Sequence, residues 1–378
     1  MQPYSLTFFY LIFGFILLSW VVVKLMSPKM TVYYFFISTG LYLYFVYSSS
    51  FLKILFMTLF YLLLIKLADV FKNVPRLFFV LTALIPLFIF KLSDLFPVLS
   101  GFNNKIVFVG ISYVSFRIIQ ILLDLQMSKP ENYLGVFIFL FNPITLLAGP
   151  IDRYYRFEEN LKNINSELNK KSFLQGWYLL CFGVLQKFIL AYFWDIYVMK
   201  KFNQQSHEWV HILGTAYSYT VYLVLDFSGY SLMAVGLSYM MGIKLPMNFN
   251  KPWLTKNPAD LWRRFHITLG SFLNDYFFKP IYMWLARKNF FKTHRLLAQN
   301  ISLFLTFLLM GAWNGLKWNY ILSGFMFGLS SVVYNTYQTQ FKKSRHFLLS
   351  ERMLLVYRIF FINYIVIALY LFSGKLPI

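Results

Sequence analysis

The chain has 378 residues, of which 59% are apolar and 13% are charged, about half the charged fraction of a typical soluble domain. So little polar surface cannot cover so much apolar area, which excludes a soluble globular enzyme. Lys and Arg outnumber Asp and Glu by 35 to 14, but the high hydrophobicity excludes a disordered or nucleic-acid-binding chain. The composition therefore predicts an all-α polytopic membrane protein, with the lipid bilayer and no nucleic acid among its partners.

Apolar stretches of about 20 residues, the length of a membrane-crossing helix, recur along the whole chain. They predict about ten to twelve helices, some of them re-entrant or interfacial, because the basic loops do not alternate consistently between two sides. The first stretch is predicted to be a retained helix, because it has almost no basic lead-in and no small-residue cleavage site. The candidate spans are 4–26, 31–49, 51–66, 77–93, 106–125, 132–149, 172–194, 209–227, 228–243, 298–312, 318–337 and 353–373.

Basic residues gather in the loops between these spans. Residues 244–264 and 287–295 are the best candidates for the cytoplasmic face, where Lys and Arg concentrate in membrane proteins. No internal repeat and no Pro- or Ser-rich linker divides the sequence, which predicts a single membrane domain over residues 1–378. The single cysteine, Cys181, and the lack of His or Cys pairs at ligand spacing predict neither a disulfide nor a metal site.

Asp226 and Arg117 are ionisable residues inside apolar stretches, where a charge is costly and marks a candidate site. Asp226 is followed at once by Ser228 and Gly229, so it is interpreted either as a site residue or as a carboxylate at a helix break. Arg117 lies in an apolar stretch of 20 residues, and we expect it to form an ion pair within the helix bundle.

Two further stretches combine polar and aromatic residues. Residues 261–288 are amphipathic at a helical period and carry too many charges for a clean crossing, so they are predicted to lie at the interface or to re-enter. Asn257 or Asp260 is a suitable cap for this helix, and the local pattern leaves His266 either structural or catalytic. Residues 310–324, rich in Gly, Asn and Trp, are typical of a turn between two spans.

Taken in order, these stretches resemble the membrane-bound O-acyltransferase family, and within it the branch that transfers D-alanyl groups to teichoic acid. The resemblance runs from about residue 106 to the C-terminus, so it implies N-terminal helices over 1–105 and a catalytic core over 106–378. The matching stretches are Gly149-Pro-Ile-Asp-Arg153, Asp226-Phe-Ser-Gly-Tyr230-Ser with the following loop 241–252, Trp262-Arg-Arg-Phe-His266-Ile-Thr-Leu, and Met310-Gly-Ala-Trp313-Asn314-Gly315.

The resemblance implies a ring of transmembrane helices around a central funnel and tunnel, in a multi-pass protein of the bacterial plasma membrane. It implies O-acyl transfer from a cytosolic D-alanyl carrier protein (DltC-like), which presents a phosphopantetheine-linked D-alanyl thioester; the chain itself binds no cofactor. A DltD-like partner on the extracellular face and a lipoteichoic or teichoic acid acceptor complete the expected assembly.

The matching motif positions also imply the site residues. Asn314, at the family's catalytic histidine position, and His266 are the expected catalytic residues. Lys279 departs from the family, which tends to be apolar there, but a lysine suits an acidic carrier. The other expected residues are Trp313, Asp226, Tyr230 and Arg264 at the tunnel and substrate, and Lys279, Tyr282 and Met283 at the docked carrier.

Asn314 is the departure that affects the chemistry. A hydroxyl that attacks a thioester needs a base near neutral pH, which an imidazole supplies and an amide does not. Loss of a general base typically costs about 10²–10⁴-fold in rate. Three explanations stay open: an inactivated variant, a natural member that binds the carrier without transfer, or an enzyme in which His266 is the base and Asn314 orients the substrate.

Three alternative functions compete with D-alanyl transfer. An alginate-type polysaccharide O-acetyltransferase is disfavoured because residues 279–284 read Lys-Pro-Ile-Tyr-Met-Trp, where those relatives have a Pro-Leu-Gly-Gly turn. A non-catalytic carrier-binding or channel protein of the same fold is the second alternative. A secondary transporter is the third, and the absence of internal repeats and of acid pairs in the spans argues against it.

Overall fold

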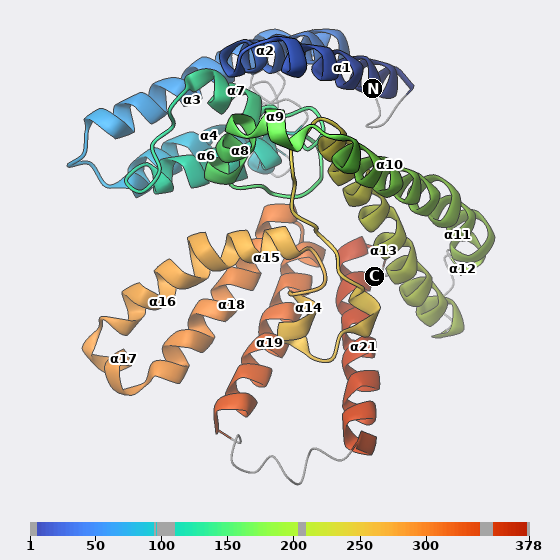
Figure 1. The fold of residues 1–378 in the computed structure, drawn as a ribbon. Helices are drawn as coiled ribbons and strands as arrows, with labels where there is room; N and C mark the ends of the chain where they lie inside the picture. Colours follow the sequence, from blue (N-terminus) through green and yellow to red (C-terminus); the bar gives the residue numbers. More distant parts are fainter. Residues whose placement is uncertain (1–5, 94–95, 97–109, 203–208, 341–350, 376–378) are drawn as a thin grey trace. The chain divides into compact units, whose positions relative to one another are not determined.

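The computed structural model describes residues 6–93, 96, 110–202, 209–340 and 351–375. These residues form helices joined by turns and loops (Figure 1), and their one β-pairing is an isolated antiparallel bridge between Phe249 and Phe265. The described residues contain seven helical stretches long and apolar enough to cross a membrane, which confirms the all-α polytopic prediction. They are Phe8–Leu25, Ser48–Val70, Arg76–Ser93, Lys170–Phe202, Trp209–Met240, Arg295–Asn314 and Leu355–Ser373.

The helices form two compact units, and the boundary between them falls within helix α13 (Trp209–Met240). The expected start of the catalytic core at residue 106 lies outside the described residues, as does the beginning of the span 106–125. The total of ten to twelve spans, the funnel and the tunnel stay predictions. The first unit comprises Met1–Gly183 with Tyr230–Pro246, and the second comprises Val184–Gly229 with Met247–Ile378.

The first unit contains the N-terminal helices and the end of α13. Glycines bring α10 (Lys170–Val184) and α13 close together, because a Cβ added at Gly176 would lie 2.5 Å from the carbonyl oxygen of Gly236. Small residues permit this approach of backbones in membrane helices. The other helices of the unit are α1 (Leu6–Leu25), α2 (Pro28–Val46), α3 (Phe51–Val70), α4 (Arg76–Ser93), α6 (Ile111–Asp124), α7 (Tyr133–Leu140), α8 (Tyr154–Lys162) and α9 (Ile164–Glu167).

The predicted membrane span over 132–149 is wrong, because α7 has only eight residues. Asn132 caps the start of α7 with its side-chain oxygen. Pro143 ends any helical continuation, since it lacks an N–H donor and disfavours helical geometry at Asn142. The Asn142 side chain instead accepts a backbone N–H in a turn, and the chain runs on without a helix until Tyr154.

The second unit contains the C-terminal helices, of which α18 (Arg295–Asn314) and α19 (Trp318–Gln340) form a closely packed pair. A Cβ added at Gly311 would lie 2.5 Å from the carbonyl oxygen of Tyr320. The Ser323 hydroxyl donates to the carbonyl of Ala368 at 2.8 Å, which joins α19 to α21 (Glu351–Ser373). The shorter helices are α11 (Tyr192–Trp194), α12 (Lys200–Phe202), α14 (Pro258–Leu261), α15 (Ile267–Leu273), α16 (Lys279–Ala286) and α17 (Asn289–Thr293), with π-helical turns at Leu185–Ala191, Asp195–Met199 and Asn274–Phe278.

Helix α13 is continuous over 32 residues, so the predicted helix break at Ser228 and Gly229 is wrong. The polar side chains there are satisfied by the π-helical turn Leu185–Ala191 of the same unit. The Ser228 hydroxyl donates to Gln186 Oε1 at 3.0 Å, and the Asp226 carboxylate forms an ion pair with the ammonium group of Lys187. Because the hydroxyl and the carboxylate both have partners, the helix continues past Ser228 and Gly229.

Candidate active site

His266 lies immediately before α15, in a left-handed backbone conformation with φ 50° and ψ 48°. This conformation is uncommon for a residue other than glycine and is enriched at functional sites. Two backbone hydrogen bonds flank the residue: Asn250 N–H donates to the Arg264 carbonyl at 2.8 Å, and Ile267 N–H donates to the Asn248 carbonyl at 2.9 Å. A short antiparallel pairing therefore holds His266 in place.

The imidazole of His266 packs between an aromatic ring and an amide. Phe227 of α13 meets it edge-on, with ring centroids 4.8 Å apart, and Asn248 Oδ1 lies 3.2 Å from its Nδ1. Burial lowers the pKa of His266 to about 3, since desolvation disfavours the imidazolium. The ring is therefore neutral at physiological pH, and its free nitrogen can accept a proton, although burial makes it a weaker base than a solvated imidazole.

Asp226 directly precedes Phe227, whose ring contacts His266, and both predicted site residues belong to the second unit. Its carboxylate is paired with Lys187, and the two side chains are 30% and 19% exposed. Lys187 is a functional neighbour that no motif predicts, although a lone lysine in the apolar stretch 184–194 was a usable signal. The ion pair supplies the compensation that a charge in this position requires.

Arg264 is held by the cap of the preceding helix, α14. Its Nε donates to Asp260 Oδ2 at 3.0 Å, and Asp260 N–H donates to Asn257 Oδ1 at 2.9 Å. Asn257 is therefore the cap of the four-residue helix α14. The cap predicted for a helix over 261–288 is wrong, because that helix begins at Ile267 and follows His266. Tyr230 belongs to the first unit, where its side chain is buried.

Asn314 is the last residue of α18 and is exposed. Its Nδ2 donates to the Met310 carbonyl at 2.8 Å, one turn back in the same helix. Trp313 beside it is partly buried. The segment that leads to His266 also reaches this helix, because Trp262 packs on Phe307 with ring centroids 5.0 Å apart. Asn314 follows that contact by about two helical turns.

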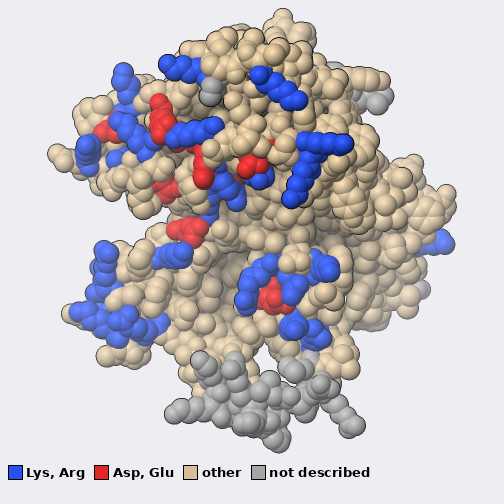
Figure 2. All heavy atoms as spheres, viewed as in Figure 1, with Lys and Arg blue, Asp and Glu red and all other residues tan. Residues whose placement is uncertain are grey.

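The three residues predicted to meet a carrier lie on or next to an exposed face of α16. Lys279 forms an ion pair with Asp275 at 2.8 Å, Tyr282 stacks on Phe278, and Met283 is 52% exposed. Figure 2 shows Lys and Arg gathered over α16 and α17. We call the exposed residues of this set the basic surface: Lys279, Arg287, Lys288, Lys292 and Arg295.

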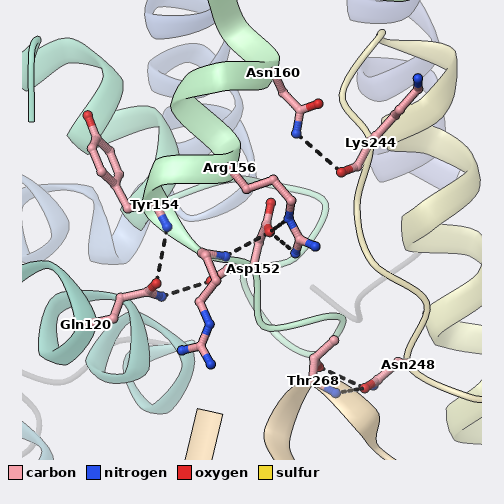
Figure 3. A network of polar contacts seen from close by, with 9 residues as sticks. Gln120, Asp152, Tyr154, Arg156, Asn160, Lys244, Asn248 and Thr268 are labelled. Carbon is pink, nitrogen blue, oxygen red and sulfur yellow. Dashed lines mark hydrogen bonds and ion pairs between the residues drawn. The ribbon is translucent and has the colours of Figure 1, made fainter. Parts of the chain in front are cut away.

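In the first unit, the Gly-Pro-Ile-Asp-Arg stretch forms a buried polar network before α8 (Figure 3). Asp152 is 5% exposed, and its Oδ1 accepts from Arg156 Nε at 2.7 Å. Gln120 of α6 bridges the stretch: its Nε2 donates to the Asp152 carbonyl at 2.9 Å, and its Oε1 accepts Tyr154 N–H at 3.2 Å. These contacts fix where α8 begins.

Arg117 of α6 also holds this region together, and it is 3% exposed. The predicted ion pair is wrong: among the described residues, the guanidinium donates to carbonyl and hydroxyl oxygens. It reaches the carbonyls of Phe139 at 2.9 Å and Leu140 at 2.7 Å, which end α7, and the carbonyl of Thr145 at 2.6 Å. The terminal carbonyls of a helix lack intrahelical partners, so Arg117 satisfies the end of α7.

Comparison with known proteins identifies the family of this chain. The pattern of the MBOAT, membrane-bound O-acyltransferase family matches residues 87–374. The chain is 33% identical to a teichoic acid D-alanyltransferase of Bacillus subtilis over 99% of this chain and 98% of that protein. It is 31% identical to a teichoic acid D-alanyltransferase of Streptococcus thermophilus (66% and 61%), and 32% identical to a probable alginate O-acetylase of Pseudomonas putida (58% and 44%).

The apolar helices and the polar residues set among them define a multi-pass membrane protein. The chain belongs to the membrane-bound O-acyltransferase family, and it is an acyltransferase by that membership.

Proposed function

We propose that this protein transfers D-alanyl groups from a carrier-protein thioester to teichoic or lipoteichoic acid at the bacterial plasma membrane. The observation that carries the proposal is the similarity to the Bacillus subtilis teichoic acid D-alanyltransferase, which spans nearly the whole of both chains. Relatives named as O-acetyltransferases of peptidoglycan or alginate match over only 58% of this chain, so the alginate-type alternative is the weaker one.

In the proposed reaction, the acceptor hydroxyl oxygen bonds to the carbonyl carbon of the thioester, while the hydroxyl proton passes to Nε2 of His266. The C–S bond then breaks, and the phosphopantetheine thiolate takes the proton from the imidazolium. The products are a D-alanyl ester and a free thiol, and His266 returns to its neutral form. His266 suits this role because its imidazole is neutral and held by neighbouring groups on two sides.

Asn314 has a different proposed role, because an amide does not take up a proton near neutral pH. Its exposed position at the end of α18 suits a group that orients the substrate by hydrogen bonding. Trp313 and Tyr230 are proposed to line the path of the acyl group, and Asp226 and Arg264 to support it through their ion pairs with Lys187 and Asp260.

The basic surface is the proposed docking site for a small acidic D-alanyl carrier protein (DltC-like) on the cytosolic side. Lys279, Tyr282 and Met283 supply a charge, an aromatic ring and a flexible apolar side chain at its centre. Complementary charge steers such an encounter and fixes its orientation. A DltD-like partner on the extracellular face would act where the D-alanyl ester forms.

The test is a transfer assay in proteoliposomes, with carrier protein loaded with labelled D-alanine as donor and lipoteichoic acid as acceptor. We expect label in the acceptor, a loss of about 10²-fold or more in His266→Ala, and a gain in Asn314→His. His294→Ala is the matched control, since His294 is an exposed histidine stacked on Phe290. Equal rates for His266→Ala and His294→Ala would remove His266 from the mechanism.

A second function, carrier binding without transfer, is favoured by one observation: an amide replaces the family's histidine at residue 314. It predicts that the loaded carrier binds but no label reaches the acceptor, and that Asn314→His alone starts transfer. The two functions are therefore separated in the same assay by the unmodified chain.

A further inference from the structure

Asn248 is a buried residue whose side-chain oxygen accepts hydrogen bonds and whose side-chain nitrogen, among the described residues, donates none. The residue is 1% exposed. Its Oδ1 accepts the backbone N–H of Thr268 at 3.2 Å and the hydroxyl of the same residue at 2.8 Å (Figure 3). Among the described residues its Nδ2 has no hydrogen-bond partner. A buried donor without a partner is unfavourable. The residue type is therefore explained by the hydrogen bonds that the side-chain oxygen accepts.

The backbone fixes which way the amide points. A backbone N–H can only donate, so the side-chain atom that faces Thr268 N–H must be the oxygen. The same oxygen lies 3.2 Å from Nδ1 of His266. An oxygen that accepts from this nitrogen requires a proton on Nδ1. A neutral imidazole carries a single ring proton, so its Nε2 bears the free lone pair.

We propose that Asn248 is a positioning residue for His266: its side-chain oxygen holds the ring in the Nδ1-protonated tautomer and leaves Nε2 free to accept the proton of the acceptor hydroxyl. The inference rests on the proposed acyl transfer. Which ring nitrogen carries the proton is set by the hydrogen bond that the other one makes or lacks, and the wrong tautomer disables a histidine base even when the geometry is intact.

The backbone around the two residues makes this contact durable. Asn248 also accepts Ile267 N–H with its own carbonyl at 2.9 Å, so both its main chain and its side chain hold the segment around His266. The left-handed φ of 50° at His266 turns the chain sharply at this point. The edge-on contact with Phe227 limits rotation of the ring from another side.

Two of the charged groups on the surrounding elements form ion pairs with their neighbours, and Lys251 and Arg263 also lie on the segments that flank the site. On α13, Asp226 pairs with Lys187, and before His266 itself, Arg264 pairs with Asp260. The cause of the lowered pKa of His266 is burial. A carboxylate introduced at residue 248 would therefore be a new charge beside the ring, and it would raise the pKa of the imidazole.

The experiment is ¹⁵N NMR of the full chain in lipid nanodiscs, with labelled histidine and His266→Gln used to assign the His266 signals among the five histidines. We expect Nδ1 to be protonated in the unmodified chain. Asn248→Ala should shift the ring toward the Nε2-protonated tautomer, and Asn248→Asp should keep Nδ1 protonated with a raised pKa. Asn250→Ala, an exposed amide on the same segment, is the matched control and should leave the signals unchanged.

The transfer assay supplies the second readout. Asn248→Ala should lower the rate by about 10²-fold. Asn248→Asp should restore activity at high pH, with the acid limb of the pH profile moved upward, because the imidazolium then persists to higher pH. The inference is overturned if Nε2 of His266 is protonated in the unmodified chain, or if Asn248→Ala leaves the tautomer of His266 unchanged. The tautomer is measured without substrate, so a lack of D-alanyl transfer by the unmodified chain would count against the proposed function alone.

Discussion

At the scale of single residues, Arg117 shows how carbonyl oxygens hold a buried positive charge. Its guanidinium is surrounded by carbonyl oxygens from the end of α7 and the turn that follows. The planar fork of arginine suits several acceptors at once, whereas the ammonium group of lysine is a compact charge on a flexible stem. The residue therefore organises backbone that has no regular structure of its own.

We expect Arg117→Ala to lower the free energy of unfolding by about 3 kcal/mol or more, because several buried carbonyls would lose their donor and each costs about 1–3 kcal/mol when left unsatisfied. Arg117→Lys should recover part of this loss. The measurement is thermal unfolding of the purified protein in detergent. Arg287→Ala, at an exposed arginine, is the control, and equal melting temperatures for the two alanine variants would contradict the assignment.

At the scale of helices, close contact between α18 and α19 depends on glycine. We expect Gly311→Ala to destabilise the protein by about 1–3 kcal/mol, the usual cost of overpacking, since the new Cβ would lie 2.5 Å from a backbone oxygen that cannot move away. Gly14→Ala is the matched control, because a Cβ there meets no atom within 4 Å. It should be neutral or stabilising by up to about 1 kcal/mol, and a similar loss in both variants would refute the packing argument.

The ion pair between Lys187 and Asp226 joins two helical segments of the second unit. We expect Lys187→Met and Asp226→Asn each to destabilise the fold, and the double variant to be less destabilised than their sum. A coupling energy of about 1–3 kcal/mol is typical of such neighbours, and partial exposure of both groups favours the lower end. A double-mutant cycle of thermal unfolding measures it, and additive effects would mean that the pair is not coupled.

At the scale of the whole molecule, part of the excess positive charge lies on the basic surface, which is the proposed docking site of the acidic carrier protein. We expect Lys279→Glu to weaken binding of the loaded carrier by about tenfold, since it reverses a charge at a complementary interface, and binding to weaken as salt rises. Surface plasmon resonance on nanodiscs measures both effects. Lys171→Glu, at an exposed lysine of α10, is the control. Salt-independent binding, or equal losses in the two variants, would place the carrier elsewhere.

Sequence patterns predicted the helical class, because the length of an apolar stretch is a local property. They identified Asn257 as a helix cap but assigned it to the wrong helix. They failed where a distant residue decides the local structure. The predicted span 132–149 is broken at Pro143, and the backbone freed there is satisfied by Arg117, more than 20 residues away. The predicted break at Ser228 does not occur, because Gln186 satisfies the hydroxyl from another helical turn.

The candidate site was predictable in part. His266 and Asn314 follow from motif positions that a reader of the sequence can find. Asn248 precedes His266 by 18 residues, and no periodicity links the two. Their contact follows from the antiparallel pairing that includes Phe249 and Phe265, which is a tertiary feature. The role of Asn248 could therefore be inferred only from the folded chain.

The exposed end of α18 has a consequence for the gene that encodes it. Asparagine and histidine codons differ in their first base alone, so one point mutation exchanges the amide at residue 314 for an imidazole. The side chain there is exposed, so a ring would fit without repacking a core. Under selection for faster acyl transfer, substitutions to histidine at codon 314 should therefore be among the first to arise.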